Sequence, residues 1–427
     1  MRRAAVTIIK WEWLILLLLL PLLMFPTGWR GLLLLAIPFL WLLRKVATGY
    51  FIPHTPYDVT LLILITAVLI SLTAVFDMGL SFPKIAGLLL GIAFFYAGVQ
   101  FTRDNEMGVY YLLGLIIVSG TAMVMAGMLS RLQYSNYAFL NPVFGLIPAP
   151  IAATLDFVPG GVNPNELAGV LSWVIPLLLA CMAGFWSPLW RSGRWWLRLL
   201  LAALVLILVI DSLLLLSTRS RGGLLAVLTA LLIMLAIRYR WGRWLLVITI
   251  IGVVALGFYL DLGAFLQGET QTAVDLGLQG RLEIWSRALY GLADFPFTGM
   301  SMNGFRQVVH ILYPLFTISP DFDMGHAHNH LLQAGLDLGI AGLIAYLGIW
   351  VLSAALLWIG WRRSRSRSDQ LLIIGLSGSM AAGWIFGILD AIALGARPGF
   401  LWWLLLALLV TVFDHALERE TLEGNTT

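Results

Sequence analysis

A short turn with two arginines, from Ser217 to Gly223, has the side chains needed to bind an anion. Arg219 and Arg221 lie in this turn between two long apolar runs. Guanidinium groups bind phosphates and carboxylates through paired, charge-assisted hydrogen bonds. Gly222 and Gly223 begin the next run, where the uncovered amide groups of a helix start would add to the positive field. The turn therefore indicates an anion site. The alternative is that both side chains reach the phosphates of surrounding lipids.

Three histidines alternate in the segment Gly325-His326-Ala327-His328-Asn329-His330, directly before another apolar run. On a β-strand the three side chains would share one face and could bind a metal ion. A helix that begins near Asn329 would instead separate them, and only Asp321 and Asp323 offer carboxylates at short spacing. We therefore favour one working imidazole, a general base near neutral pH, over a metal site. Ordinary loop histidines are the remaining alternative.

A third candidate arginine begins an amphipathic segment that runs from Gly280 to Leu292. The segment has the spacing of a helix with one apolar face, formed by Ile284, Ala288, Leu289 and Leu292. Glu283 and Arg287 are spaced i, i+4, so we expect an ion pair between them. Arg281 lies in the first turn, where a cation gains nothing from the helix dipole. This unfavourable position favours a functional role for Arg281.

Most of the remaining chain consists of apolar runs long enough to cross a bilayer. The 427 residues are 60% hydrophobic and only 11% charged, whereas a soluble domain has about 25% charged residues. The runs are continuous and Leu-rich, which favours helices over the alternating strands of a β-barrel. We therefore predict an all-α polytopic membrane protein with about twelve transmembrane helices. The expected spans lie near residues 9–26, 30–46, 57–76, 83–101, 107–128, 166–186, 195–217, 222–238, 241–260, 330–360, 370–393 and 398–415.

The distribution of basic residues predicts which side of the membrane each connection faces. With the N-terminus inside, most of the 26 Lys and Arg residues fall in inner segments, which is the positive-inside bias. This bias also explains the net charge of +4 without a nucleic-acid partner. Two long connections then face outward, 129–165 and 261–329. The predicted division is transmembrane helices 1–9 over 1–260, a large extracytoplasmic loop with short helices over 261–329, and helices 10–12 with a cytoplasmic tail over 330–427.

Three acidic residues fall near the outer ends of predicted spans, namely Asp211, Asp337 and Asp390. A charge at such depth costs about 2.5–3.5 kcal/mol on insertion scales, so each carboxylate needs a partner. The outer arginines are candidates for that role. The stretch from Asn163 to Ala168 places proline, asparagine and glutamate directly before an apolar run, which is typical of a helix start.

These features together resemble the O-antigen ligase and O-antigen polymerase superfamily of membrane glycosyltransferases. The first shared motif is Ser220-Arg221-Gly222 at the start of a span. The second is Arg281 with Ile284-Trp285, followed by Pro296 and Gly299. The third resembles the ligase pattern of a histidine followed at fixed spacing by two glycines, here His328-Asn329, Gly339 and Gly342. The stretch Asn163-Pro164-Asn165-Glu166-Leu167-Ala168 is also similar to one common in the family.

The resemblance implies a donor glycan on undecaprenyl diphosphate at the outer face of the bacterial inner membrane, surrounded by membrane lipids. The acceptor would be a lipid or another glycan, and no cofactor or metal is implied. By resemblance, Arg221 and Arg281 hold the diphosphate, and His328 acts as general base on the acceptor hydroxyl. Further candidate substrate-binding residues are Arg219 as a supporting charge, Asn329, and His326 and His330, whose roles stay open.

Two alternatives to a ligase stay open. A polymerase would use another glycan as acceptor, and the ligase-type histidine spacing favours the ligase. A transporter or flippase of lipid-linked sugars would share the arginines and the apolar spans, but it would more often show internal repeats and broken helices at the midplane. Neither feature is clear in the sequence. We expect Arg221, Arg281 and His328 to meet on the non-cytoplasmic side.

Overall fold

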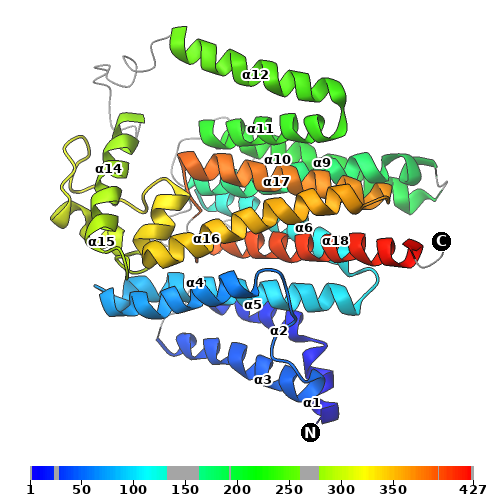
Figure 1. Cartoon of the computed structure of the whole chain (residues 1–427), viewed down its shortest axis with the longest axis horizontal. Coiled ribbons are helices and arrows are strands. Elements are labelled where there is room, and N and C mark those ends of the chain that lie inside the picture. Colours follow the sequence, from blue (N-terminus) through cyan, green and yellow to red (C-terminus); the bar gives the residue numbers. More distant parts are fainter. Residues whose placement is uncertain are drawn as a thin grey trace. The chain divides into compact units, whose positions relative to one another are not determined.

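The structure is a computed structural model that describes residues 2–23, 28–131, 163–191, 194–259, 278–392 and 394–424. All regular elements in these ranges are helices (Figure 1). Nine of these described helices are long and apolar enough to cross a membrane. The prediction of an all-α polytopic membrane protein is therefore confirmed. Most of the predicted outer connection 129–165 and the first part of 261–329 lie outside the described residues.

The helices of the first half of the chain are α1 (Arg2–Ile9), α2 (Glu12–Leu23), η1 (Gly28–Leu35), α3 (Ala36–Thr48), α4 (Asp58–Ser71), η2 (Leu72–Ala74), α5 (Met78–Asp104), α6 (Gly108–Arg131) and α9 (Pro164–Arg191). Those of the second half are α10 (Trp195–Ser217), α11 (Arg221–Arg238), α12 (Arg240–Tyr259), α14 (Leu278–Asp294), α15 (Gly304–Leu312), α16 (His330–Arg363), α17 (Arg367–Leu389), η5 (Arg397–Gly399) and α18 (Phe400–Gly424).

Each of the twelve expected spans corresponds to helical residues, but three are not among the nine long apolar helices of the described ranges. The first is bent by 60° between α1 and α2, and counting this pair as one span gives ten. The third is the shorter apolar helix Asp58–Ala74. The ninth corresponds to α12, which has 20 residues, but the side chains of residues 257–259 at its end lie outside the described part of the structure.

Two compact units share the chain in an interleaved order. The first comprises Met1–Gly108, Tyr239–Leu356 and Gly387–Thr411, and the second comprises Val109–Arg238, Leu357–Phe386 and Val412–Thr427. The division at residues 260 and 329 follows the expected topology along the sequence and stays a prediction. Arg281 and His328 belong to the first unit, whereas Arg219 and Arg221 belong to the second.

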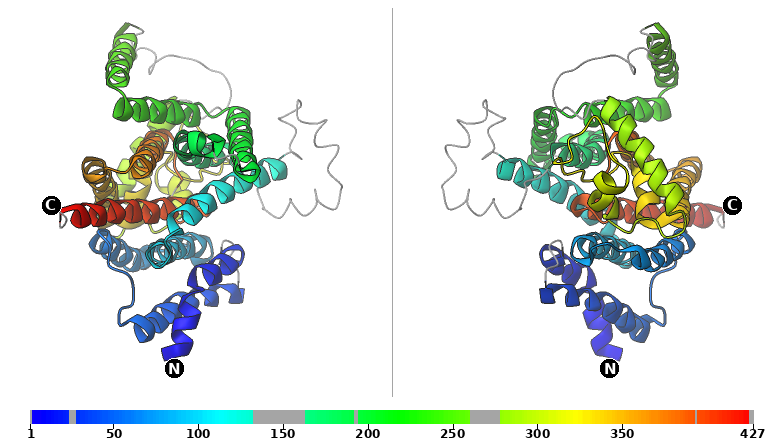
Figure 2. Two further views of the ribbon diagram at one scale, coloured as in Figure 1. Left: turned by 90° about the vertical axis from the view of Figure 1, so that its right-hand side faces the viewer. Right: turned by 90° about the vertical axis from the view of Figure 1, so that its left-hand side faces the viewer.

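Helices of the first unit pack through glycines and paired hydroxyl groups. A Cβ atom on Gly91 would lie only 2.1 Å from the Trp403 ring, so glycine allows α5 to approach α18. The hydroxyl groups of Thr102 and Thr411 also join these helices, at 2.6 Å. Helices α1 to α3, in dark blue, form a group at one edge of this unit (Figure 2), where Arg44 forms a buried ion pair with Glu12.

Helix α16 is interrupted in its first third by the segment from Pro296 to Met300. Gly339 has φ 68° and ψ −171°, so the helical hydrogen bonds break there. The freed carbonyl of Leu336 accepts from the Met300 amide at 2.6 Å, and the Ile340 amide donates to the Pro296 carbonyl at 2.8 Å. A Cβ atom on Gly339 would lie 2.7 Å from the Phe297 carbonyl oxygen. The motif residues around Pro296 and Gly339 therefore form one joint.

Helices α14 and α15 pack beside the first turns of α16 (Figure 1). Ile284 and Ala288 of α14 join a buried core with residues of α15 and α16. This part of the expected apolar face is confirmed, but Leu289 lies off this face and is 55% exposed. The expected ion pair between Glu283 and Arg287 is present at 3.8 Å.

Helix α9 packs against both α10 and α11 in the second unit. A Cβ atom on Gly223 would lie 2.6 Å from the Cβ of Ala168, so glycine allows close contact between the two family-like motifs in this unit. The buried Asp211 accepts a hydrogen bond from Thr121 at 3.0 Å. Within the described residues its partner is therefore this hydroxyl group of α6 rather than an outer arginine.

Candidate active site at the start of helix α16

Asn329 places the histidine segment by capping α16. Its side-chain oxygen accepts from the amides of Leu331 and Leu332 at 3.0 and 3.1 Å, which satisfies two uncovered N–H groups of the helix start. Its side-chain nitrogen donates to the Ile388 carbonyl at 3.2 Å, near the end of α17. These contacts bring the start of α16 to the end of α17. A substrate-binding role for Asn329 stays a prediction.

His328 is buried and held in an unusual backbone conformation. Its φ of 49° lies in the left-handed region, which a residue other than glycine adopts at a cost and which is frequent at functional sites. Its Nδ1 lies 3.2 Å from Oδ1 of Asp390. An ionised carboxylate only accepts hydrogen bonds, so Nδ1 carries the proton and Nε2 keeps its lone pair. This arrangement prepares Nε2 of His328 to accept a proton.

His326 lies beside His328 as a neutral ring. The backbone amide of His328 donates to Nδ1 of His326 at 3.1 Å, so the ring proton is on Nε2. Nε2 lies 3.5 Å from Oδ1 of Asp390. Burial lowers the pKa of His326 to about 3 despite the opposing effect of Asp390, and the charges of Lys84 and Arg281 add to the lowering. His326 therefore stays uncharged near neutral pH.

Asp390 follows α17 and connects both histidines to Arg281. Burial alone would raise its pKa, but the hydrogen bond from His328 and the two histidine rings hold that pKa at about 2. The Ala391 amide also donates to its Oδ1 at 2.8 Å. Its Oδ2 lies 3.8 Å from Nη2 of Arg281. Arg281, one of the candidate arginines, is therefore a partner of this carboxylate, and its place on the outer side stays a prediction.

Asp390 also changes the argument about a metal ion. One ligand atom each from His326, His328 and Asp390 lies within 4.8 Å of the other two, a spacing that could hold an ion. Asp321 and Asp323 are the carboxylates at short spacing in the sequence, but the fold brings the distant Asp390 to the histidines. However, the guanidinium of Arg281 beside Asp390 opposes a divalent cation. The absence of a metal stays a prediction.

The expected separation of the three histidines holds for His330 alone. Its Nδ1 lies 3.0 Å from the Tyr346 hydroxyl, and its ring packs against Trp350. A Cβ atom on Gly387 would lie 2.6 Å from the His330 ring. His326 and His328, in contrast, stay together with ring centroids 4.4 Å apart. Binding of substrate by His326 or His330 stays a prediction.

A chain of amide hydrogen bonds supports the backbone next to His328. The amide of Ala327 donates to Gln333 Oε1 at 2.8 Å, and Gln333 Nε2 donates to Asp337 Oδ1 at 2.8 Å. The Asn303 amide donates to the same Asp337 oxygen at 3.2 Å. Asp337 is therefore partnered by amide groups, and the expectation of an arginine partner finds no support among the described contacts. The chain ties the histidine segment to the start of α15.

The arginine turn of the second unit is built by hydroxyl groups. Ser220 Oγ accepts from the Gly223 amide at 3.2 Å and so caps α11. Arg219 has φ 54°, and both Arg219 and Arg221 are exposed. Within the described part of the chain, neither guanidinium forms an ion pair. Because Arg221 and Arg281 belong to different units, their joint role stays a prediction.

Comparison with known proteins supports the resemblance. Residues 206–347 match a family model described as O-antigen ligase. The matched segment includes Arg221, Arg281 and His328 but not Asp390. No curated protein sequence matches the chain. The match to the family model confirms the predicted relation to the O-antigen ligase and polymerase superfamily.

Proposed function

We propose that this multi-pass membrane protein of the O-antigen ligase and polymerase superfamily transfers a glycan from undecaprenyl diphosphate to an acceptor hydroxyl. The family indicates a glycosyltransferase-like enzyme that acts on lipid-linked glycans. The observation that carries the finer proposal is the contact of Asp390 with both His328 and Arg281. It joins a group that accepts a proton to a group that binds phosphate.

The proposed reaction is a direct displacement. The acceptor oxygen attacks the anomeric carbon of the donor, and the bond from this carbon to the diphosphate breaks. The hydroxyl proton goes to Nε2 of His328, while Asp390 stabilises the resulting imidazolium. The diphosphate leaves with the bonding electrons, and Arg281 and Arg221 stabilise its growing charge without a metal, with Arg219 as a supporting charge. Release of the proton to water restores the base.

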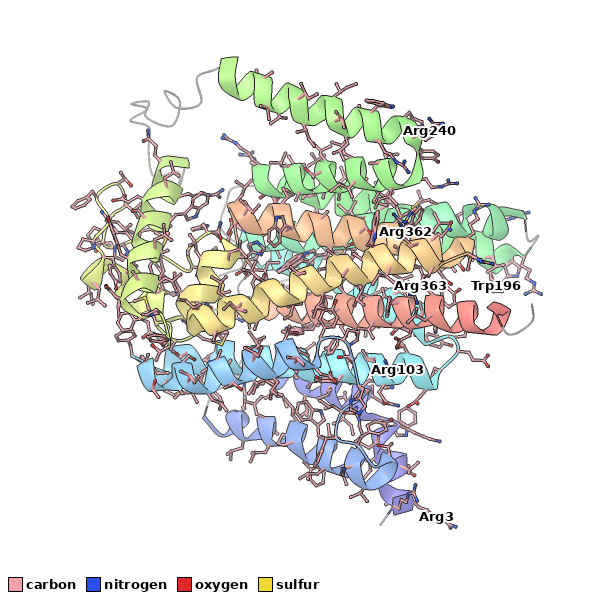
Figure 3. The ribbon with its side chains drawn as sticks, in the orientation of Figure 1. Arg3, Arg103, Trp196, Arg240, Arg362 and Arg363 are labelled. Carbon is pink, nitrogen blue, oxygen red and sulfur yellow. The ribbon has the colours of Figure 1, made fainter. Side chains whose placement is uncertain are left out.

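We place this reaction at the outer face of the bacterial inner membrane. The side chain of Asn303 donates to the Leu80 carbonyl at 3.1 Å, so α15 begins near the start of α5. Figure 3 shows Arg103 at the end of α5 away from α14 and α15. Basic residues favour the inner side, which supports an outer position for the site. The lipid tail of the donor would lie along the apolar spans.

A transporter is the competing class, and the break in α16 is the observation that could favour it. Transporters often use interrupted helices to expose backbone groups to a substrate at the midplane. Here the backbone groups freed near Gly339 are occupied by Met300 and Pro296 instead. This arrangement supports a fixed joint rather than a substrate site. Between ligase and polymerase, the ligase-type histidine spacing favours the ligase.

The test is a transfer assay with the purified chain in lipid vesicles. The vesicles contain a polyprenyl diphosphate glycan and, in separate samples, a lipid-core acceptor or a second glycan. Mass spectrometry then detects a covalently joined product. A ligase yields product with the lipid acceptor and a polymerase with the glycan, whereas a transporter moves the donor across the bilayer unchanged.

His328→Ala should abolish the transfer. The matched control is His310→Ala, because His310 contacts the Phe322 carbonyl within the loop and lies outside the histidine site. If His328→Ala transfers the glycan as fully as the wild-type protein does, His328 is not the base, although the proposed transfer itself still stands.

A further inference from the structure

Two N–H groups on α14 are buried without a hydrogen-bond partner among the described residues. They are Nε of Arg281 and Nε1 of Trp285. A buried donor that finds no acceptor costs about 1–3 kcal/mol, so two such groups together need an explanation. Both atoms can only donate, so a partner must supply acceptor oxygens.

The position of α14 brings both donors to the same side of the helix. Arg281 and Trp285 are one turn apart, so their side chains are neighbours on the helix surface. Ile284 and Ala288 are buried in the core with α15 and α16, which fixes the rotation of α14. Nη2 of Arg281 lies 3.8 Å from Oδ2 of Asp390, and this oxygen also has no hydrogen-bond partner among the described residues. Arg281 therefore lies beside the group that contacts His328, and Trp285 is its neighbour one turn along α14.

We propose that Trp285 is a further residue of the donor site and that its indole N–H binds the diphosphate together with Nε of Arg281. The inference rests on the proposed function and adds a residue to it. Phosphate oxygens fit the two donors, because Arg pairs with phosphate through several N–H groups and an indole N–H adds a neutral donor. A sugar hydroxyl would accept from one of the two donors, but as a neutral group it would not balance the positive charge of Arg281 as a phosphate does.

A neutral donor has a specific advantage at this position. Asp390 carries a negative charge beside Arg281 and repels an incoming phosphate. The indole N–H attracts phosphate oxygen without adding a cation that would form a second ion pair with Asp390. Trp285 thus binds the diphosphate together with Arg281, while the Asp390 carboxylate keeps its hydrogen bond with His328.

The first experiment measures binding of a short-chain polyprenyl diphosphate without a glycan to the detergent-purified full chain. Trp285→Phe keeps an aromatic ring and removes only the N–H group, so we expect its Kd to rise about 5- to 10-fold. The matched control is Trp402→Phe. The Trp402 indole N–H is also buried without a described partner, but its ring packs against Tyr346 and Trp403 in the spans. The control should bind as the wild-type protein does.

A second variant and a second ligand sharpen this test. Trp285→Tyr supplies a hydroxyl donor and should recover part of the lost binding, whereas a purely structural role of the indole would give no such recovery. A polyprenyl alcohol without phosphate should bind the wild-type protein and Trp285→Phe equally. Unchanged diphosphate binding by Trp285→Phe, with the expected loss in Arg281→Lys, would overturn the inference.

The inference and the proposed function fail in different measurements. A wild-type protein that binds polyprenyl diphosphate but forms no product with any acceptor contradicts the proposed transfer, while the Kd values still decide the role of Trp285. Conversely, active transfer with equal Kd values for wild type and Trp285→Phe contradicts the inference alone. Non-additive loss of binding in Arg281→Lys combined with Trp285→Phe supports a shared phosphate, and additive loss contradicts it.

Discussion

Nδ1 of His328 donates to Oδ1 of Asp390 across 3.2 Å, although 62 residues separate them in the sequence. This contact fixes the tautomer of His328, because the carboxylate holds the proton on Nδ1 and leaves Nε2 free to act as a base. The same carboxylate approaches Arg281 at 3.8 Å. The proposed base and a proposed phosphate-binding arginine thus contact the same acidic residue, which is outside the segment that matches the family model.

Asp390→Asn should lower kcat of glycan transfer about 100-fold or more, because an amide neither fixes the tautomer nor stabilises the imidazolium. The KM of the donor should change much less. Steady-state kinetics with the lipid-linked donor separate the two effects. Asp323→Asn is the control, since Asp323 is 61% exposed and pairs with Arg306. A kcat close to that of the wild-type protein would show that His328 works without this carboxylate.

His326 should make the fold sensitive to mild acid. Its pKa is lowered from 6.5 to about 3 by burial, so the unfolded chain takes up a proton at a pH where the folded chain does not. Stability conferred by the neutral ring is therefore complete above about pH 6.5 and is lost progressively as the pH falls toward 3. His326→Asn keeps an acceptor for the His328 amide but cannot titrate. Its thermal midpoint should fall less than that of the wild-type protein between about pH 7 and pH 5. Parallel curves for the two proteins would contradict this role of His326.

Gly339→Ala should destabilise the joint in α16 by about 1–3 kcal/mol, because alanine is strained at positive φ. The added Cβ would also lie 2.7 Å from the Phe297 carbonyl oxygen. Thermal unfolding in detergent, monitored by intrinsic fluorescence, measures the loss. Gly114→Ala is the matched control, because a Cβ on Gly114 in α6 meets nothing within 4 Å. Equal midpoints for the two variants would show that the joint is not tightly packed.

Local sequence features predict the helices well, because each span depends mainly on its own composition. The joint at Gly339 is different. The resemblance points to Gly299 and Gly339, but only the structure explains why glycine is needed at both positions: the segment from Pro296 to Met300 inserts into α16 and leaves no room for a Cβ atom. The pairing of His328 with Asp390 depends on tertiary packing, which no local pattern encodes. Hydropathy indicates only that Asp390 needs a partner.

The histidine segment shows why backbone detail limits such predictions. A helix beginning near Asn329 is expected to separate all three rings, and α16 does begin at His330. The left-handed conformation of His328 nevertheless brings its ring back to His326. The residue type gives only a weak indication of this conformation, since histidine adopts a positive φ more often than most residues but still uncommonly.

Chelation should leave glycan transfer unchanged. His326, His328 and Asp390 could hold an ion, but Arg281 adds positive charge beside them. We expect activity in EDTA to stay within about twofold of the untreated protein, since arginines rather than a metal stabilise the leaving group. Metal content measured on the same purified sample is the control. A loss of activity that zinc or magnesium restores would assign the three residues to a metal instead.

Arg221 and Arg281 should act on the same diphosphate, although they belong to different units of the fold. Each single change to Lys keeps a charge but removes the planar guanidinium, so each should weaken binding of polyprenyl diphosphate. If one phosphate group contacts both, the double variant should differ from the sum of the single effects by about 0.5–3 kcal/mol. Binding of the same lipid to Arg219→Lys serves as the comparison, because Arg219 is expected only to support the charge. Unchanged binding by Arg221→Lys, with a loss of binding in Arg281→Lys, would mean that the proposed donor site consists of Arg281 without the turn at the start of α11.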